Sequence, residues 1–151
     1  KLLVEAAVKQ PREIERSILG NDKPEASVPG EVIPSGAFYD YNAKYIDDQT
    51  QLVIPANLTA ERTTEVQTMA VAAFQSLDCN GMARIDFLLD GSSDQLYVNE
   101  VNTLPGFTTI SHYAKLWEVS GLPYPALLDR LIDLAFAQHR RRQRIHTSST
   151  Q

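Results

Sequence analysis

The sequence predicts an α+β fold, in which a mostly antiparallel sheet packs against helices. Three observations predict it: strand-like segments fill much of the first third of the chain, residues 60–77 form an amphipathic helical pattern, and residues 82–101 resemble a β-hairpin. Strands joined by short turns pair antiparallel, and an amphipathic helix buries its apolar stripe against such a sheet. Helices interleaved with strands in the second half of the chain favour the same architecture.

The first 57 residues contain strand patterns and one long irregular stretch. Residues 1–5 resemble the end of a buried strand, and residues 12–19 alternate loosely before the turn Gly20-Asn21-Asp22. Residues 26–33 are a further strand candidate, interrupted by Pro29-Gly30. Residues 34–57 are rich in Pro, Gly, Asp and Tyr and lack a helical period. A loop of this length is more often functional than a plain connection.

Three helices are expected. The segment 60–77 carries one apolar stripe, with Thr59 as its N-cap and Asn80-Gly81 after its end. A short helix is expected over residues 111–120, and a last amphipathic helix from Pro125 to about His139. The side chains expected to face inward are Val66, Met69, Ala70, Ala73, Phe74 and Leu77 in the first helix, and Leu127, Leu128, Leu131, Ile132, Leu134 and Ala135 in the last.

The composition is that of an ordinary soluble protein. The chain has 151 residues, 43% of them hydrophobic, and shows neither a signal-peptide pattern nor an apolar run near the roughly 18 residues of a membrane span. Its single cysteine, Cys79, fits a reducing compartment, so we expect a cytoplasmic location and a buried, unreactive thiol. Four of the 14 Lys and Arg lie at positions 140–144, so the first 138 residues hold ten against all 19 Asp and Glu. This balance argues against a nucleic-acid partner, and we expect a folded part over 1–139 and a flexible basic tail over 140–151.

Charged and amide side chains gather on one face of the expected hairpin. Arg84 and Asp86 share a face of the first strand, and Glu100 and Asn102 share a face of the second. Two carboxylates and an amide oxygen are hard ligands suited to Mg²⁺. The same residues would equally form a surface ion-pair cluster around Arg84, which contributes little to stability. From the residues alone both interpretations stay open.

The length of the hairpin turn decides whether the carboxylates meet. With a five-residue loop over 90–94, Leu89 pairs with Gln95, and Asp86 lies diagonal to Glu100 on the same face. A four-residue loop would instead place the two carboxylates on opposite faces. We expect the five-residue loop.

The loop that follows the hairpin, residues 103–111, is rich in turn residues and leads into a helix. It exposes backbone N–H groups near Gly106 and Ser111 that suit a carboxylate or an oxyanion. A cation, a guanidinium and an amide-rich loop together favour ATP-dependent activation of an acyl group. The sequence has no P-loop, dinucleotide-binding or G-x-S-x-G motif, so those nucleotide-binding and hydrolase classes have no support.

Four motifs resemble the signature of D-alanine–D-alanine ligases, a family of the ATP-grasp superfamily. They are Arg-Glu-Ile-Glu at 12–15, Phe-Tyr-Asp-Tyr-Asn-Ala-Lys-Tyr at 38–45, Arg-Ile-Asp-Phe at 84–87, and Asn-Glu-Val-Asn-Thr-Leu-Pro-Gly-Phe-Thr at 99–108. The resemblance runs from Val4 to about Ala137 and covers only the C-terminal part of such an enzyme. It implies the ATP-grasp C-terminal subdomain as the fold.

The resemblance also implies a role for particular residues. The implied ligands of two Mg²⁺ ions, with Mn²⁺ as the alternative, are Asp86, Glu100 and Asn102. The implied ATP contacts are Glu5 and the backbone of Val8 at the adenine, Glu13 at the ribose, Lys44 at the phosphates, and Phe38, which lies against the adenine or in the core. The implied catalytic contacts are Arg84 and the Gly106 amide at the tetrahedral intermediate, Ser111 with the backbone of residue 112 at the carboxylate of the second D-alanine, and Tyr45, which favours an amine acceptor.

Some positions depart from the pattern of that family. One extra residue around Lys9-Gln10-Pro11 shifts the adenine alignment by one position, and Asn42 stands where a glutamate is common. His112 and Ala114 replace a hydrophobic residue and a proline, and we expect His112 to fill space beside the second D-alanine. Glu15 we expect to be a solvated charge at a strand edge.

The activity implied by the resemblance is the joining of two D-alanines through a D-alanyl phosphate, for peptidoglycan precursor synthesis. The implied partners are ATP and D-alanine, with no nucleic acid or membrane, and the parent enzyme is expected to be a homodimer. Three alternatives stay open: a D-alanine–D-lactate or other ATP-grasp ligase, an inactive nucleotide- or metal-binding fragment, and a purely structural domain. We expect the isolated chain to be inactive, because half of the nucleotide cleft is missing.

Overall fold

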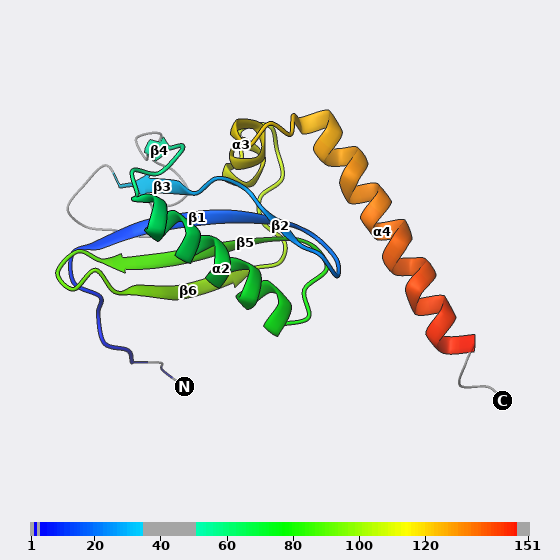
Figure 1. Cartoon of the computed structure of the whole chain (residues 1–151), viewed down its shortest axis with the longest axis horizontal. Helices are drawn as coiled ribbons and strands as arrows, with labels where there is room; N and C mark the ends of the chain where they lie inside the picture. Colours follow the sequence, from blue (N-terminus) through cyan, green and yellow to red (C-terminus); the bar gives the residue numbers. More distant parts are fainter. Residues whose placement is uncertain (1, 3, 35–50, 148–151) are drawn as a thin grey trace.

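The fold is built on a sheet in which all described pairings are antiparallel (Figure 1). The structure, a computed structural model, describes residues 2, 4–34 and 51–147. Within these residues the sheet has six strands, in the order β4-β3-β1-β5-β6, with β2 paired to the end of β1. The strands are β1 (Pro11–Gly20), β2 (Glu25–Ala26), β3 (Gly30–Ile33), β4 (Gln51–Val53), β5 (Gly81–Asp90) and β6 (Leu96–Asn102). The predicted α+β class is confirmed.

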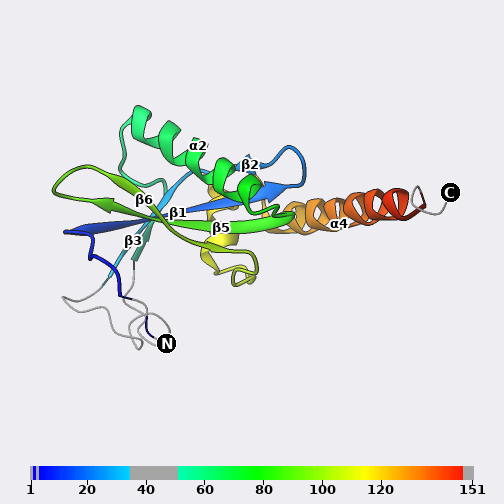
Figure 2. The same cartoon turned by 90° about the horizontal axis from the view of Figure 1, so that it is seen from below.

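The two faces of this sheet are covered differently. Helix α2 (Ala60–Ser76) lies across one face, here called the α2 face, while α3 (His112–Val119) and the start of α4 (Tyr124–Thr147) lie on the opposite side (Figure 2). The larger apolar core lies under α2 and includes Ile14, Phe74 and Phe87. A smaller core joins α3 and α4 to the ends of β1 and β5, around Leu19, Tyr113, Trp117 and Leu127. The rest of the second face carries charged side chains and is called the charged face below.

Helix α2 agrees with its sequence pattern except at its end. It begins at Ala60, and the Thr59 hydroxyl caps it by accepting a hydrogen bond from the Arg62 N–H at 3.2 Å. It ends at Ser76, and Leu77 is 61% exposed rather than inward, because it lies in the C-terminal cap beyond the last buried turn. Cys79 is half-buried against the larger core, and burial raises the pKa of its thiol, as expected for an unreactive cysteine.

Helix α3 is confirmed, but α4 is longer than predicted. It runs to Thr147 rather than to about His139, since no glycine or proline interrupts residues 126–147. The proposed boundary at residue 139 is therefore not a boundary of secondary structure. The predicted inward face was also too wide: Leu128, Ile132 and Ala135 are exposed, because the domain meets only the stripe of Leu127, Leu131 and Leu134. Among the described helices none has the length and hydropathy of a membrane span.

Two predictions for the first third of the chain were wrong. Leu2 and Val4 are 97% and 90% exposed and belong to no strand, because no strand of the described chain lies beside them to complete a pair. The stretch 34–57 is not wholly irregular, since β4 lies within it and pairs with β3. Residues 35–50 lie outside the described residues, and with them the predicted site residues Phe38, Lys44 and Tyr45.

Candidate functional site

The turn of the β5–β6 hairpin is longer than predicted. Leu89 pairs with Leu96 rather than with Gln95, so six residues, 90–95, separate the paired strands. If alternation continued unbroken from this pair, Asp86 and Glu100 would point to opposite faces of the sheet. The predicted register was therefore wrong.

A β-bulge corrects the alternation before the strand reaches the acidic residues. The register shifts between Phe87 and Asp86: Phe87 pairs with Val98, but Asp86 pairs with Glu100, which leaves Asn99 as the extra residue. Asp86 and Glu100 consequently lie directly opposite each other on the charged face, closer than the diagonal that was predicted. The next pair on the same face joins Arg84 to Asn102, so the four side chains expected to share a face do share it.

The turn itself is held by one carboxylate. Asp90 Oδ1 accepts hydrogen bonds from the Ser92 N–H at 2.8 Å, the Ser92 hydroxyl at 2.6 Å and the Ser93 N–H at 3.1 Å. These bonds stabilise the charged form, so they lower the pKa of Asp90 to about 2. Its other oxygen accepts from the Lys9 N–H at 3.4 Å, which attaches the chain before β1 to the turn.

Arg84 is the electrostatic centre of the charged face. Its Nε donates to Asp86 Oδ1 at 2.7 Å and its Nη2 to Asp86 Oδ2 at 2.8 Å, which is the two-pronged geometry of a strong arginine–carboxylate pair. Glu15 Oε2 lies 3.6 Å from Arg84 Nε. Burial alone would lower the pKa of Arg84, but the bond to Asp86 and the charges of Glu15, Asp86 and Glu100 outweigh it and raise the pKa.

Glu15 and His112 form a contact that the sequence did not reveal. Glu15 is 7% exposed, not a solvated edge charge, and its Oε2 lies 2.8 Å from His112 Nδ1. His112 is therefore not only a space-filling side chain. The two residues are 97 positions apart, and only the departure of His112 from the family pattern marked it as unusual.

The loop 103–111 is anchored at its middle. The ring of Phe107 packs against the rings of Tyr113 and Tyr124, with centroids 5.9 Å and 5.5 Å apart. Ser111 is the N-cap of α3 but its side chain does not cap the helix; its hydroxyl instead accepts from the Thr108 N–H at 2.9 Å. The first backbone N–H groups of α3 therefore lack a capping side chain at the place where a carboxylate was expected.

Gly106 is exposed on the same loop. A Cβ built there would meet Ser111 Oγ at 3.5 Å, an ordinary contact. Packing within the described residues therefore does not require glycine at this position.

The residues expected at the nucleotide lie before and within β1. Glu13 is half-buried on the charged face, in a row that pairs it with Leu88 on one side and Val32 on the other. Glu5 is exposed and Val8 half-buried in the irregular segment that precedes the strand. Gln10 has a φ of 45°, so the chain kinks between this segment and β1.

The described residues contain no ready-made group of three His, Cys, Asp or Glu that would hold a metal ion. Asp86 is occupied by Arg84, and the Asn102 Oδ1 accepts from the Leu104 N–H at 3.1 Å. The oxygen donors nevertheless share one face in adjacent pairs, and their chemistry is that of a Mg²⁺ site. Their chemistry and their positions fit the ion, provided that Asp86 and Asn102 exchange their present hydrogen bonds for bonds to it.

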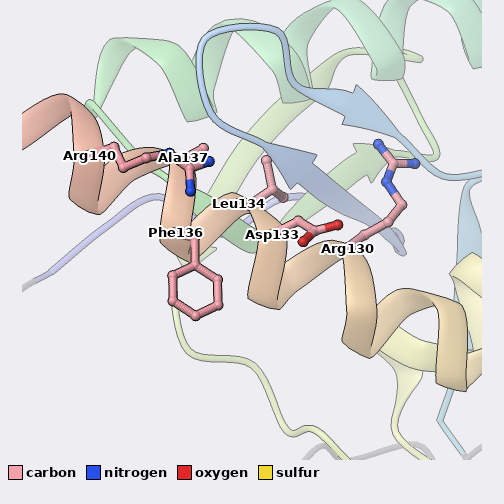
Figure 3. Close-up of a pocket in the computed structure, with 6 residues that line it drawn as sticks. All are labelled: Arg130, Asp133, Leu134, Phe136, Ala137 and Arg140. Atoms are coloured by element: carbon pink, nitrogen blue, oxygen red, sulfur yellow. The ribbon is translucent and has the colours of Figure 1, made fainter.

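A hollow beside α4 is separate from this face. It is lined by Arg130, Asp133, Leu134, Phe136, Ala137 and Arg140, and Phe136 points away from the strands (Figure 3). None of these residues is among the predicted site residues. Arg130 pairs with Glu25, its Nη2 lying 2.8 Å from Glu25 Oε1.

The comparisons with known proteins show which family the chain belongs to. The family model described as D-ala D-ala ligase C-terminus matches residues 1–133. The chain belongs to this family. The match covers the β5–β6 hairpin, the loop 103–111 and α3, and so confirms the resemblance found in the motifs.

Individual relatives support the same assignment. The chain is 53% identical over 144 residues to a D-alanine–D-alanine ligase of Heliobacterium modesticaldum, covering 95% of this chain and 39% of the relative. It is 56% identical over 140 residues to that of a Thermoanaerobacter species, covering 92% and 39%. The chain thus spans about two fifths of the length of these curated relatives.

Solved structures of the family have the same fold. The D-alanine–D-alanine ligase of Coxiella burnetii superposes with a TM-score of 0.82 at 40% identity, covering 95% of this chain and 37% of that one. The VanG D-Ala:D-Ser ligase of Enterococcus faecalis gives a TM-score of 0.72 at 33% identity, covering 83% and 36%.

Proposed function

We propose that this chain is the C-terminal part of an ATP-dependent ligase that joins two D-alanines for peptidoglycan precursor synthesis. In the proposed reaction a D-alanine carboxylate oxygen attacks the γ-phosphorus of ATP, giving D-alanyl phosphate and ADP. The amine of a second D-alanine then attacks the acyl carbon, and phosphate leaves. The chain covers about two fifths of its relatives' length, so it would supply only part of the site for the whole activity.

The pairing of Arg84, Asp86, Glu100 and Asn102 on one face is the observation that carries the proposal. Arg84 would stabilise the negative charge that develops on the acyl-phosphate and tetrahedral oxygens, because a guanidinium held among carboxylates stays protonated. Gly106 would add its N–H to the same charge. Since packing leaves room at Gly106, close approach of a substrate is the reason we propose for glycine there.

Asp86, Glu100 and Asn102 would hold divalent ions, which we propose to be two Mg²⁺ or Mn²⁺ ions. When bound, these ions would neutralise charge on the phosphate oxygens of ATP. Asp86 would then give up its pairing with Arg84, whose guanidinium would be left to bind the substrate oxygens. Glu13 would bind the ribose, and Glu5 with the Val8 backbone the adenine; Phe38 and Lys44 are proposed to complete the nucleotide site.

The first turn of α3 is the proposed binding place for the acceptor's carboxylate. Ser111 and the backbone N–H of residue 112 would donate to it, because no side chain caps these N–H groups. Tyr45 is proposed to favour an amine acceptor over a hydroxy acid. The similarity to a D-Ala:D-Ser ligase keeps a different second amino acid as the alternative, which product analysis with Tyr45→Phe would address.

The test is phosphate release from ATP and D-alanine by the full-length protein, with the dipeptide identified by mass spectrometry. We expect activity that requires Mg²⁺ and falls at least a hundredfold in Asp86→Asn, which leaves one acceptor oxygen where the carboxylate had two. Asp129→Asn, an exposed acid-to-amide change on α4, is the matched control and should keep full activity. Activity of Asp86→Asn equal to that of the control would contradict the proposed metal site.

The remaining parts of the proposal concern the intact protein. We propose a cytoplasmic homodimer with no nucleic-acid or membrane partner, which light scattering and cell fractionation would check. We also propose that residues 1–151 alone release no phosphate, because half of the nucleotide cleft would be missing.

A further inference from the structure

The contact between Glu15 and His112 links the charged face to the start of α3. Glu15 lies in one row of the sheet with Asp86, its partner on β5, and Gly30, its partner on β3. The Glu15 side chain is 10% exposed, and its Oε2 lies 2.8 Å from His112 Nδ1 and 3.6 Å from Arg84 Nε. A carboxylate so little exposed is costly unless cations or donors satisfy it, and these two residues do so.

The same row explains how α3 approaches closely enough. A Cβ at Gly30 would lie 2.8 Å from Leu116 Cδ2, so glycine allows α3 to rest on β3 at this point. His112 and Leu116 are four positions apart and share a face of the helix. Leu116 therefore packs on Gly30 while His112, one turn nearer the site, meets Glu15.

A second residue, Tyr113, holds α3 at a different place. Its hydroxyl donates to the Ile18 carbonyl oxygen at 2.9 Å, and its own carbonyl accepts from the Ser17 hydroxyl at 3.3 Å. Tyr113 thus attaches the helix to the buried end of β1. Only His112 attaches its first turn to the charged face, among the contacts of the described residues.

We propose that Glu15 is a positioning residue that, through His112, fixes the first turn of α3 relative to Arg84. The inference rests on the proposed function, in which that turn binds the carboxylate of the acceptor and Arg84 the oxygens of the acyl group. Glu15 Oε2 lies near both His112 and Arg84, so Glu15 would set the separation between acceptor and acyl phosphate. It would also be the carboxylate that stays beside Arg84 when Asp86 binds a metal ion.

The test is the kinetics of the full-length protein with D-alanine varied at saturating ATP. His112→Met keeps the bulk of the side chain and removes the bond to Glu15. We expect it to raise the Michaelis constant of the second D-alanine about tenfold or more, as for loss of a hydrogen bond to a charged group, with that of ATP changed less than twofold. His112→Asn can place an amide N–H where Nδ1 lies, and should return the constant to within about threefold of the wild type.

A double-mutant cycle separates this role from a structural one. If Glu15 acts through His112, Glu15→Gln combined with His112→Met should be little worse than the more impaired single variant. Tyr113→Phe is the control on the same helix: it should lower the thermal midpoint and leave the second Michaelis constant within about twofold.

Three results would overturn the inference. They are equal increases for ATP and D-alanine in His112→Met, no rescue by His112→Asn, or an effect of Tyr113→Phe on the acceptor as large as that of His112→Met. A wild-type protein that forms no dipeptide would instead overturn the proposed function itself, and this inference with it.

Discussion

Arg16 and Arg84 lie on neighbouring strands of one sheet but on opposite faces. Their surroundings shift the pKa of the guanidinium in opposite directions. Arg16 is 4% exposed under α2, where it donates to the Thr63 carbonyl at 2.9 Å and to Gln67 Oε1 at 3.3 Å, and burial lowers its pKa to about 10. Arg84 is also largely buried, but three carboxylates raise its pKa. The burial of Arg16 on the α2 face therefore costs stability. On the charged face, carboxylates surround Arg84 and keep it protonated, as its proposed role at the substrate requires.

The largest effect expected is on the α2 face. Phe74 is fully buried there, and Phe74→Ala should lower the free energy of unfolding by about 3–5 kcal/mol, because the lost contacts leave a cavity. Urea unfolding followed by circular dichroism measures this change. Leu128→Ala on the exposed side of α4 is the control and should lower it by less than about 1 kcal/mol. Equal losses would mean that α2 does not cover the main core.

The charged face should respond in activity rather than in stability. Arg84→Lys keeps the charge but loses the two-pronged geometry, so ligase activity of the full-length protein should fall by about 10²–10³-fold while the thermal midpoint shifts by only a few degrees. Arg130→Lys, at a half-buried arginine paired with Glu25, is the matched control. Retention of more than a tenth of the activity in Arg84→Lys would remove Arg84 from the reacting centre.

A substitution at Arg16 tests whether burial of its charge lowers the free energy of unfolding. Replacing a buried charge by an apolar side chain of similar length is often neutral or stabilising, so Arg16→Met should change the free energy of unfolding by less than about 1 kcal/mol, or raise it. Urea unfolding checks it. A loss above about 2 kcal/mol would show that the bonds to Thr63 and Gln67 outweigh the burial of the charge.

The smallest effect concerns pH and Asp90, at the far end of the strand that carries Arg84. Its folded-state pKa, about 2, lies below the ordinary value of about 4, so its carboxylate stabilises the fold above pH 4 and loses that contribution as pH falls towards 2. Asp90→Asn should therefore flatten the dependence of the unfolding free energy on pH in this window. Urea unfolding at several pH values across this window measures the slope, and an unchanged slope in Asp90→Asn would contradict the role given to this carboxylate.

The sequence predicted well those features that depend on local patterns. The α2 stripe, its Thr59 cap and the α3 boundaries follow from short-range rules of helix formation, and the structure agrees with them. The inward set of α4 was too wide because periodicity gives the direction of a stripe but not how much of it a neighbour covers. What the local pattern could not provide was the position of the sheet relative to α4.

The candidate site was predictable in its residues but not in its connections. Asp86 and Glu100 do share a face, although for a reason other than the one predicted: the turn is one residue longer, and the bulge at Asn99 compensates. No local signal specifies a bulge in a strand of this composition. The bond from His112 to Glu15 was beyond reach for the same kind of reason, since it depends on how α3 rests on Gly30.

The extra residue Asn99 reverses the alternation of side chains along β6. Tyr97 and Glu100 therefore point to the same face, although one position is odd and the other even. Removing that single residue would turn every later side chain of β6 to the opposite face of the sheet. Glu100 and Asn102 would then enter the apolar layer beneath α2. For anyone redesigning this ribbon, the number of residues before Glu100 therefore matters more than their identity. A deletion there would move the acidic side chains from the charged face to the α2 face without changing any of them.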